Sequence, residues 1–199
     1  MGHVQKVSSL AYMSPVKSVS SSFDRTLKVW DLVKGYCIKT LFTLSSPNVV
    51  IPLSEDVLVS GHLDSFIRLW DVRSGTMISE ISTGATQVTS LTALGSKTRI
   101  LAMSRDDCIK EIDIRELGIL NTYTDKEFKV PTNYSQLFKS PDESFFGAGG
   151  VNGTLYFWDL QSGKCTTLKK SEGTIIGGAF DSSGKLWAVE RERSLLCFD

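Results

Sequence analysis

Short apolar runs recur along the whole chain, and clusters of polar turn residues separate them. In one representative stretch the runs are NVVIPL, VLVSGH, FIRLWD and MISEIS, divided by Ser-Glu-Asp, Leu-Asp-Ser and Arg-Ser-Gly. Serine, aspartate and glycine are residues that favour backbone reversal. Runs of this length are typical of β-strands, and no segment shows the 3.6-residue apolar period of an amphipathic helix. The pattern therefore predicts a four-stranded antiparallel meander.

The same motif occurs five times, as SFDRTLKVWDL, HLDSFIRLWDV, SRDDCIKEIDI, GVNGTLYFWDL and ERERSLLCFD. Each copy has an acidic or amide residue, followed six positions later by an aromatic or apolar one; the pairs are Asp24 and Trp30, Asp64 and Trp70, Asp106 and Ile112, Asn152 and Trp158, Glu192 and Phe198. Successive copies are about 40 to 46 residues apart, close to the period of WD-type propeller blades.

These units predict an all-β fold, a β-propeller of the WD-repeat type. Small sheets of short strands are not stable alone, so the units are expected to pack against one another around an axis. The chain is expected to form a single domain of five units, each four-stranded except the last, which lacks its outer strand; their expected bounds are about 1–42, 43–82, 83–125, 126–170 and 171–199.

The Trp-Asp dipeptides, together with Gly-His at the start of the chain, resemble those of the WD-repeat family. In that family a histidine, a hydroxyl residue, an aspartate and a tryptophan form a buried hydrogen-bond chain that holds each blade. The resemblance places this structural tetrad at His3, Ser20, Asp24 and Trp30, in part at Ser60, Asp64 and Trp70, and at the matching positions Asp106, Asn152 and Trp158. Alanine replaces the hydroxyl residue in later units, so these are expected to depend more on packing.

His62 aligns with Ser22, Ser104 and Gly150 rather than with the histidine that precedes a blade. We therefore interpret it as a variable position near a loop and not as a structural, catalytic or metal-binding histidine. Asp64, at the tetrad position, is expected to hold a turn. The family's usual ring has seven blades, so the chain is expected to be the last five of them, with the missing part on the N-terminal side.

Four blocks carry a closer resemblance, to the C-terminal propeller of the autophagy-related protein sixteen-like family: SSFDRTLKVWDLVKGYCIKTLF, SGHLDSFIRLWDVRSG, SRDDCIKEIDIRELGI and FKSPDESFFGAGGVNGTLYFWDLQSGK. SRDDCIKEID is the most specific block, because the family also has isoleucine there in place of tryptophan. The resemblance implies a non-catalytic scaffold, cytoplasmic and recruited to autophagosomal or endolysosomal membranes, which helps to target modifier lipidation. The implied partners are the autophagy conjugation complex, membrane-protein tails and vacuolar proton pump subunits.

Partner contacts are expected where the loops between second and third strands gather with the segments that join neighbouring units. The candidate contact residues are Phe23, Arg25, Phe42, Leu63, Phe66 and Arg105. Aromatic and arginine side chains are enriched at interaction hot spots. By resemblance, Phe42 matches an aromatic near the family's pump-recognition surface. Phe66 stands where that family has a lysine, a departure that weakens the pump assignment.

Charge and cysteine content limit the other function classes. The chain of 199 residues carries 22 basic and 22 acidic residues and has a net charge of zero, which gives no electrostatic footprint for nucleic acid. No apolar run reaches the roughly 20 residues that span a bilayer, so no membrane insertion is expected. The four cysteines have no metal-binding spacing and are expected to be free thiols.

Catalytic motifs are weak. GAGGVNG, residues 147–153, resembles a phosphate-binding loop, but a strand follows it where such a loop requires a helix N-terminus. We find no GxSxG or HExxH motif and expect neither an enzyme, a cofactor nor a metal. The alternative left open is a generic WD-repeat adaptor, such as a substrate receptor of a ubiquitin ligase or a subunit of another complex.

Overall fold

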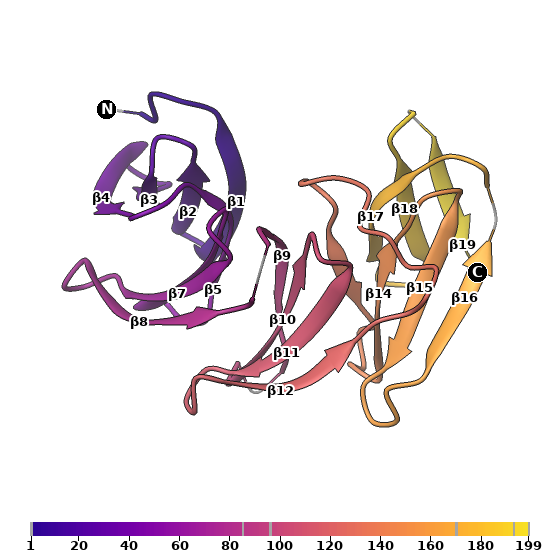
Figure 1. The fold of residues 1–199 in the computed structure, drawn as a ribbon. Coiled ribbons are helices and arrows are strands. Elements are labelled where there is room, and N and C mark those ends of the chain that lie inside the picture. The colour runs from indigo at the N-terminus through magenta and orange to yellow at the C-terminus, as the bar shows by residue number, and fades with distance from the viewer. Residues whose placement is uncertain (1, 85, 96, 170, 193, 199) are drawn as a thin grey trace.

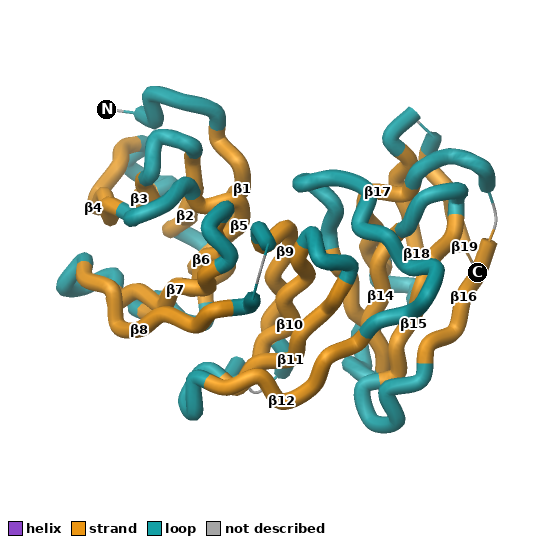
Figure 2. The backbone as a smooth tube through the Cα atoms, in the orientation of Figure 1, coloured by secondary structure: helices purple, strands orange, loops and turns teal. Residues whose placement is uncertain are grey.

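The computed structural model describes residues 2–84, 86–95, 97–169, 171–192 and 194–198. Within these residues it contains nineteen β-strands and no helix, grouped into five sheets that follow one another along the chain (Figures 1 and 2). The all-β WD-repeat propeller predicted from the sequence is confirmed. Four sheets have four strands each and the fifth has three.

Every sheet is an antiparallel meander of consecutive strands. The first contains β1 (Val7–Ser14), β2 (Lys17–Ser22), β3 (Thr26–Asp31) and β4 (Tyr36–Phe42). The second contains β5 (Pro47–Pro52), β6 (Val57–His62), β7 (Phe66–Asp71) and β8 (Thr76–Ser82). The third contains β9 (Val88–Ala93), β10 (Arg99–Ser104), β11 (Cys108–Asp113) and β12 (Gly118–Tyr123).

The last two sheets continue the order. The fourth contains β13 (Leu137–Lys139), β14 (Phe145–Gly149), β15 (Thr154–Asp159) and β16 (Cys165–Lys169). The fifth contains β17 (Ile175–Phe180), β18 (Leu186–Glu190) and β19 (Leu195–Phe198). The first strands of neighbouring sheets lie beside one another, β1 with β5, β5 with β9, β9 with β13 and β13 with β17, so they form the inner wall of the arrangement.

Apolar residues on alternate strand positions fill the spaces between neighbouring sheets. Val19, Val29 and Leu41 of the first sheet pack against Leu58 and Trp70 of the second. Further clusters lie between the second and third, third and fourth, and fourth and fifth sheets. Because successive side chains of a strand point to opposite faces, each sheet presents one face to each neighbour.

The aspartate of each Trp-Asp motif has a local role at the turn between the third and fourth strands. The Oδ1 atom of Asp31 accepts hydrogen bonds from the amides of Val33 and Lys34, at 3.0 and 2.9 Å. Equivalent pairs of amides bond to the aspartates at the same position of the next three sheets, Asp71, Asp113 and Asp159. These carboxylates hold the turns.

Candidate functional site

The turns between second and third strands meet the segments that connect neighbouring sheets. The amide of Thr43 donates to the carbonyl of Arg25 at 2.9 Å, and the amide of Leu63 donates to the carbonyl of Ser46 at 3.1 Å. The amide of Val130 bonds to Asp107 Oδ1 at 2.8 Å. We call this side the loop face and define it as residues 23–25, 42–46, 63–65, 105–107, 124–136 and 150–153. We call the opposite side the turn face; it carries the turns between third and fourth strands, at 32–35, 72–75, 114–117 and 160–164.

The loop face exposes some of the candidate contact residues and holds others in the structure. Phe42 is 79% exposed at the end of β4, Leu63 is 36% exposed, and Arg25 is exposed in a left-handed backbone conformation. Phe23 is partly buried, and its amide donates to the carbonyl of Lys6. The guanidinium of Arg105 donates to the carbonyl of Val130, so this side chain supports the loop.

Phe42 and Phe66 do not form one patch. Leu41 is buried against the second sheet, so the next residue, Phe42, projects from the opposite face of the first sheet. Phe66 precedes Ile67, which packs toward the third sheet, so Phe66 points toward the first sheet. The centroid of the Phe66 ring lies 5.2 Å from the guanidinium carbon of Arg68. The first sheet therefore separates the two phenylalanines.

A hydrogen-bond chain stabilises the first sheet from within. Trp30 Nε1 donates to Ser20 Oγ at 2.8 Å, and Ser20 Oγ lies 2.7 Å from His3 Nε2. His3 Nδ1 lies 2.9 Å from Asp24 Oδ2. Although burial raises the pKa of Asp24, hydrogen bonds from Thr26 and His3 lower it to about 2. The aspartate stays ionised, and all four side chains are fully engaged in the fold.

The second sheet has a related chain that uses His62, and our interpretation of this residue as a variable loop-proximal position is wrong. His62 is 0% exposed, and its Nε2 lies 2.7 Å from Ser60 Oγ, which also accepts from Trp70 Nε1 at 2.7 Å. His62 Nδ1 lies 2.9 Å from the carbonyl oxygen of Ser45. Because a carbonyl can only accept, Nδ1 carries the proton and Nε2 accepts from the Ser60 hydroxyl.

His62 thus takes the position that His3 holds in the first sheet, with a backbone carbonyl replacing the aspartate. Asp64 accepts from the amide of Phe66 at 3.4 Å across the turn, and both of its carboxylate oxygens accept from the guanidinium of Arg68, at 3.1 and 2.8 Å. A signal for this was present in the sequence. Ser60 and His62 are two positions apart in one strand, so their side chains must share a face.

The third and fourth sheets depart further from this arrangement. Asp106 accepts from Ser104 Oγ at 2.7 Å and from Lys110 Nζ at 2.8 Å, without a histidine or tryptophan in these contacts. Asn152, predicted at the tetrad position, lies exposed in a turn with φ of 60° and makes none of the hydrogen bonds recorded within the described ranges. Its role is to adopt the left-handed backbone conformation, which asparagine tolerates better than most residues.

Trp158 of the fourth sheet is held by packing instead. Its Nε1 is buried and has no hydrogen-bond partner among the described residues. Its ring stacks on Phe146 at a centroid distance of 5.6 Å and meets the edge of Phe128 at 5.0 Å. This agrees with the expectation that a sheet with alanine at the hydroxyl position, here Ala148, relies on apolar contacts.

The two tryptophans should respond differently to substitution. We expect Trp158→Phe to cost less free energy of unfolding than Trp70→Phe, by about 1–2 kcal/mol, because only Trp70 loses a hydrogen bond. Both changes remove a similar volume from a buried position, so each serves as the control for the other. Urea unfolding measures the difference. Equal losses would show that the indole hydrogen bond contributes nothing.

The glycine-rich stretch 147–153 also has a packing role. A Cβ atom added to Gly149 would collide with the backbone of Ile175 in the next sheet. Gly153 has φ of 65° and faces the backbone of Ser171 just as closely. The stretch therefore allows the fourth and fifth sheets to approach and turns directly into β15.

The described residues contain no group of three or more His, Cys, Asp or Glu side chains that could hold a metal ion. None of the four cysteines forms a disulfide in the described part of the chain, and all four are partly buried. Burial raises the pKa of Cys108, and raises that of Cys165 to about 11, so neither is an activated thiolate. In the described part of the chain no helix has the length and apolar character needed to cross a membrane.

Comparison with known proteins places these features in context. Residues 1–31 match the family model described as WD domain, G-beta repeat. The chain is 38% identical over 169 residues to protein tipD of Dictyostelium discoideum. This match covers 82% of this chain and 27% of the relative. It is 32% identical over 200 residues to autophagy-related protein 16 of Arabidopsis thaliana, covering 98% of this chain and 39% of the relative. It is 36% identical over 134 residues to Atg16l2 of Mus musculus, a match that covers 67% of this chain and 21% of the relative. The chain thus spans about two fifths or less of these relatives.

Proposed function

Since the chain is a WD-repeat protein of the autophagy-related protein 16-like family, we propose that it is a non-catalytic scaffold that binds other proteins. The loop face is its recognition surface. In this role the propeller connects the autophagy conjugation machinery with partners on a membrane and so helps to direct modifier lipidation.

The observation that carries the proposal is an exposed apolar group beside an arginine on the loop face. Phe42 and Leu44 are 79% and 70% exposed, and Thr43 between them is tied to the backbone of Arg25. Phe42 ends β4, and Leu44 follows in a segment that the Thr43 amide ties to the backbone of Arg25, so both side chains lose little conformational entropy on binding. The side chain of Arg25 is exposed on the same face and can add directional hydrogen bonds to a partner. This combination suits a protein partner better than a small substrate.

The proposed role in autophagy rests on the names of the relatives, one of which matches 98% of this chain. The partners that we propose on this basis are the conjugation complex, the tails of membrane proteins and subunits of the vacuolar proton pump. The protein acts in the cytoplasm and is recruited to autophagosomal or endolysosomal membranes. The neutral net charge of the chain supports protein rather than nucleic acid partners.

Affinity capture of the full-length protein from cells tests this proposal. We expect Phe42→Ser combined with Leu44→Ser to reduce recovery of membrane-associated autophagy partners at least tenfold, because the exposed apolar anchors are lost. The control changes an equally exposed apolar residue on the turn face, Val33→Ser, which should leave recovery unchanged. Equal recovery from all variants would remove the loop face as the recognition surface. Recovery of ubiquitin-ligase subunits instead would favour the adaptor alternative.

A further inference from the structure

The outer strand of the fourth sheet is more regular than its counterparts. In the first three sheets the outer strands β4, β8 and β12 each show a register shift against the third strand, which marks a bulge. β16 pairs with β15 without a shift, from Cys165 opposite Trp158 to Lys169 opposite Thr154. Bulges protect a sheet edge from pairing with another chain, because they twist the edge and interrupt its row of hydrogen-bonding groups. Within the described residues, β16 is the one outer strand among these four that lacks this protection.

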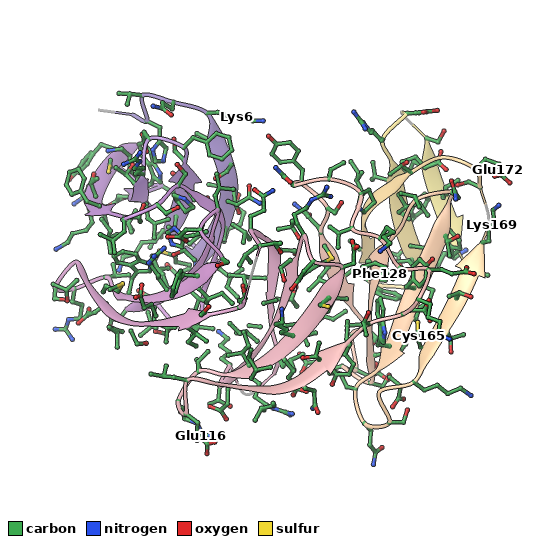
Figure 3. All side chains as sticks on the ribbon, in the orientation of Figure 1. Lys6, Glu116, Phe128, Cys165, Lys169 and Glu172 are labelled. Carbon is green, nitrogen blue, oxygen red and sulfur yellow. The ribbon has the colours of Figure 1, made fainter. Side chains whose placement is uncertain are left out.

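The same strand is accessible. It lies at the edge of the four-stranded sheet (Figure 1), and Figure 3 shows Cys165 and Lys169 near its two ends. From Thr166 onward every residue of β16 is exposed. β-Branched threonine favours the extended conformation, so the strand is already shaped for pairing.

The free backbone groups of β16 have a defined direction. The amide of Asp159 donates to the carbonyl of Lys164 at 3.1 Å, just before the strand begins. Bonded and unbonded pairs alternate along an antiparallel ladder, so Thr166 and Leu168 bond to β15. The residue between them, Thr167, therefore directs its amide and its carbonyl outward.

One side of β16 carries negative charge. A pocket of about 580 Å³ on this side is lined by Thr124, Asp125, Lys126, Glu127 and Thr167. Neither Asp125 nor Glu127 forms an ion pair within the part of the chain that the structure describes, so two carboxylates and one ammonium leave a net negative charge. Burial first, and then these two carboxylates, raise the pKa of Tyr156. Tyr156 lies opposite Thr167 in the ladder, so the negative charges act at the middle of β16.

The other side of β16 is apolar. Leu168 is 44% exposed and borders a groove that Phe157 and Phe180 also line. Successive side chains of a strand alternate between the two sides, so a strand added at this edge presents every second side chain to each of them. An occupant that matches both sides carries a basic side chain between two apolar ones.

We propose that β16 accepts an extended segment of a partner protein as an additional antiparallel strand, with a basic residue opposite Thr167 and an apolar residue on each side of it. Backbone hydrogen bonds supply affinity, and the alternating side chains supply selectivity. A second copy of this chain is a poorer occupant, because pairing β16 with itself brings the same carboxylates together. The site goes beyond the recognition surface at Phe42 and Leu44, which belongs to the first sheet, and shares with it only the role of binding proteins.

Nuclear magnetic resonance on the ¹⁵N-labelled 199-residue chain tests this with synthetic peptides. The probe is acetyl-Thr-Val-Arg-Val-Thr-amide, and its control has glutamate in place of arginine. We expect the probe to shift the amides of Thr166, Thr167 and Leu168 saturably. It should bind about tenfold more tightly than the control, because glutamate turns attraction by two carboxylates into repulsion. Equal binding of the two peptides, or no shift in β16, would overturn the proposal.

Methylated peptides show whether the probe pairs as a strand. In an antiparallel pair, the residue that exchanges backbone hydrogen bonds with Thr167 also has its side chain on the same side as Thr167. The arginine of the probe takes this place. Methylation of its amide nitrogen should therefore abolish binding, whereas methylation of the amide of the following valine should not. Equal binding of both methylated peptides, or loss of binding by the valine-methylated one alone, would contradict strand addition.

A proline variant locates the pairing on β16. Thr167→Pro removes the outward amide, and proline is tolerated at sheet edges, so the variant should fold and lose the probe. The matched control is Thr122→Pro, which changes the same residue type at the corresponding place of the bulged strand β12 and should keep binding. Binding that survives in folded Thr167→Pro would exclude β16. If this variant loses its dispersed spectrum, the methylated peptides decide the matter with the protein unchanged.

A charge variant tests the selectivity. Asp125→Asn combined with Glu127→Gln should remove the preference for arginine over glutamate. The control, Glu55→Gln with Asp56→Asn in the turn between β5 and β6, removes two exposed carboxylates elsewhere and should keep the preference. A preference that persists without Asp125 and Glu127 would contradict the assignment. These results are separable from the proposed function, because partner capture through the first sheet can succeed when the peptides fail to bind.

Discussion

Replacing Ser60 with alanine should lower the free energy of unfolding by about 3 kcal/mol, more than expected from the loss of one hydroxyl. The Ser60 hydroxyl accepts from Trp70 Nε1 and donates to His62 Nε2, both at 2.7 Å. Its removal leaves two buried polar groups without a partner, and each such group costs about 1–3 kcal/mol. Urea unfolding monitored by tryptophan fluorescence provides the measurement.

Ser104→Ala is the matched control for that substitution. Ser104 is almost as buried as Ser60, at 1% exposed against 0%, but donates a single bond, to Asp106. Asp106 keeps its bond to Lys110 in the variant, so the expected loss is about 1 kcal/mol. If Ser60→Ala costs no more than Ser104→Ala, the connected chain in the second sheet does not stabilise the fold.

Acid should destabilise the protein through His62. Burial first, and then the positive charge of Arg68, lower the pKa of His62 from 6.5 to about 4. The unfolded chain therefore binds a proton between pH 6.5 and 4 that the folded chain does not bind. The stability from this group is complete above pH 6.5 and is lost as the pH falls toward 4. At about 1.4 kcal/mol per pH unit, the loss reaches about 3 kcal/mol.

The pH effect is measured as the free energy of unfolding at pH 7 and pH 4.5, in the native chain and in His62→Asn. Comparison with the variant removes the contributions of the carboxylates, because these are common to both proteins. We expect the native chain to lose about 2–3 kcal/mol more than the variant over this interval. The same loss in both proteins would mean that His62 is not held in its neutral form.

Much of the fold was predictable because it depends on local patterns. Strand alternation and turn residues identified the meander, and the repeat spacing identified the stacking of equivalent sheets. Alanine at position 148 was enough to predict that Trp158 would be held by packing, because its usual partner cannot be present. Such predictions need only the residue types at aligned positions.

Features that depend on neighbouring sheets were not predictable in this way. His62 could be aligned with other residues at the end of a second strand, but its partner is the carbonyl of Ser45, which only the folded chain brings within 2.9 Å. Asn48 begins the run NVVIPL, which the sequence predicts as a strand, but its hydrogen bonds to the carbonyls of Val88 and Asn133 join segments that are far apart in the chain. The separation of Phe42 from Phe66 could have been derived from their buried neighbours, Leu41 and Ile67.

Hydrogen exchange of the full-length protein, free and bound to its captured partner, tests the central claim most directly, namely that the loop face is the recognition surface. Partner binding should slow the exchange of backbone amides on the loop face, in residues 23–25, 43–46 and 63–65. Exchange in the turn-face residues 32–35 and 72–75 should stay unchanged. Protection confined to the turn face, with none on the loop face, would contradict the account.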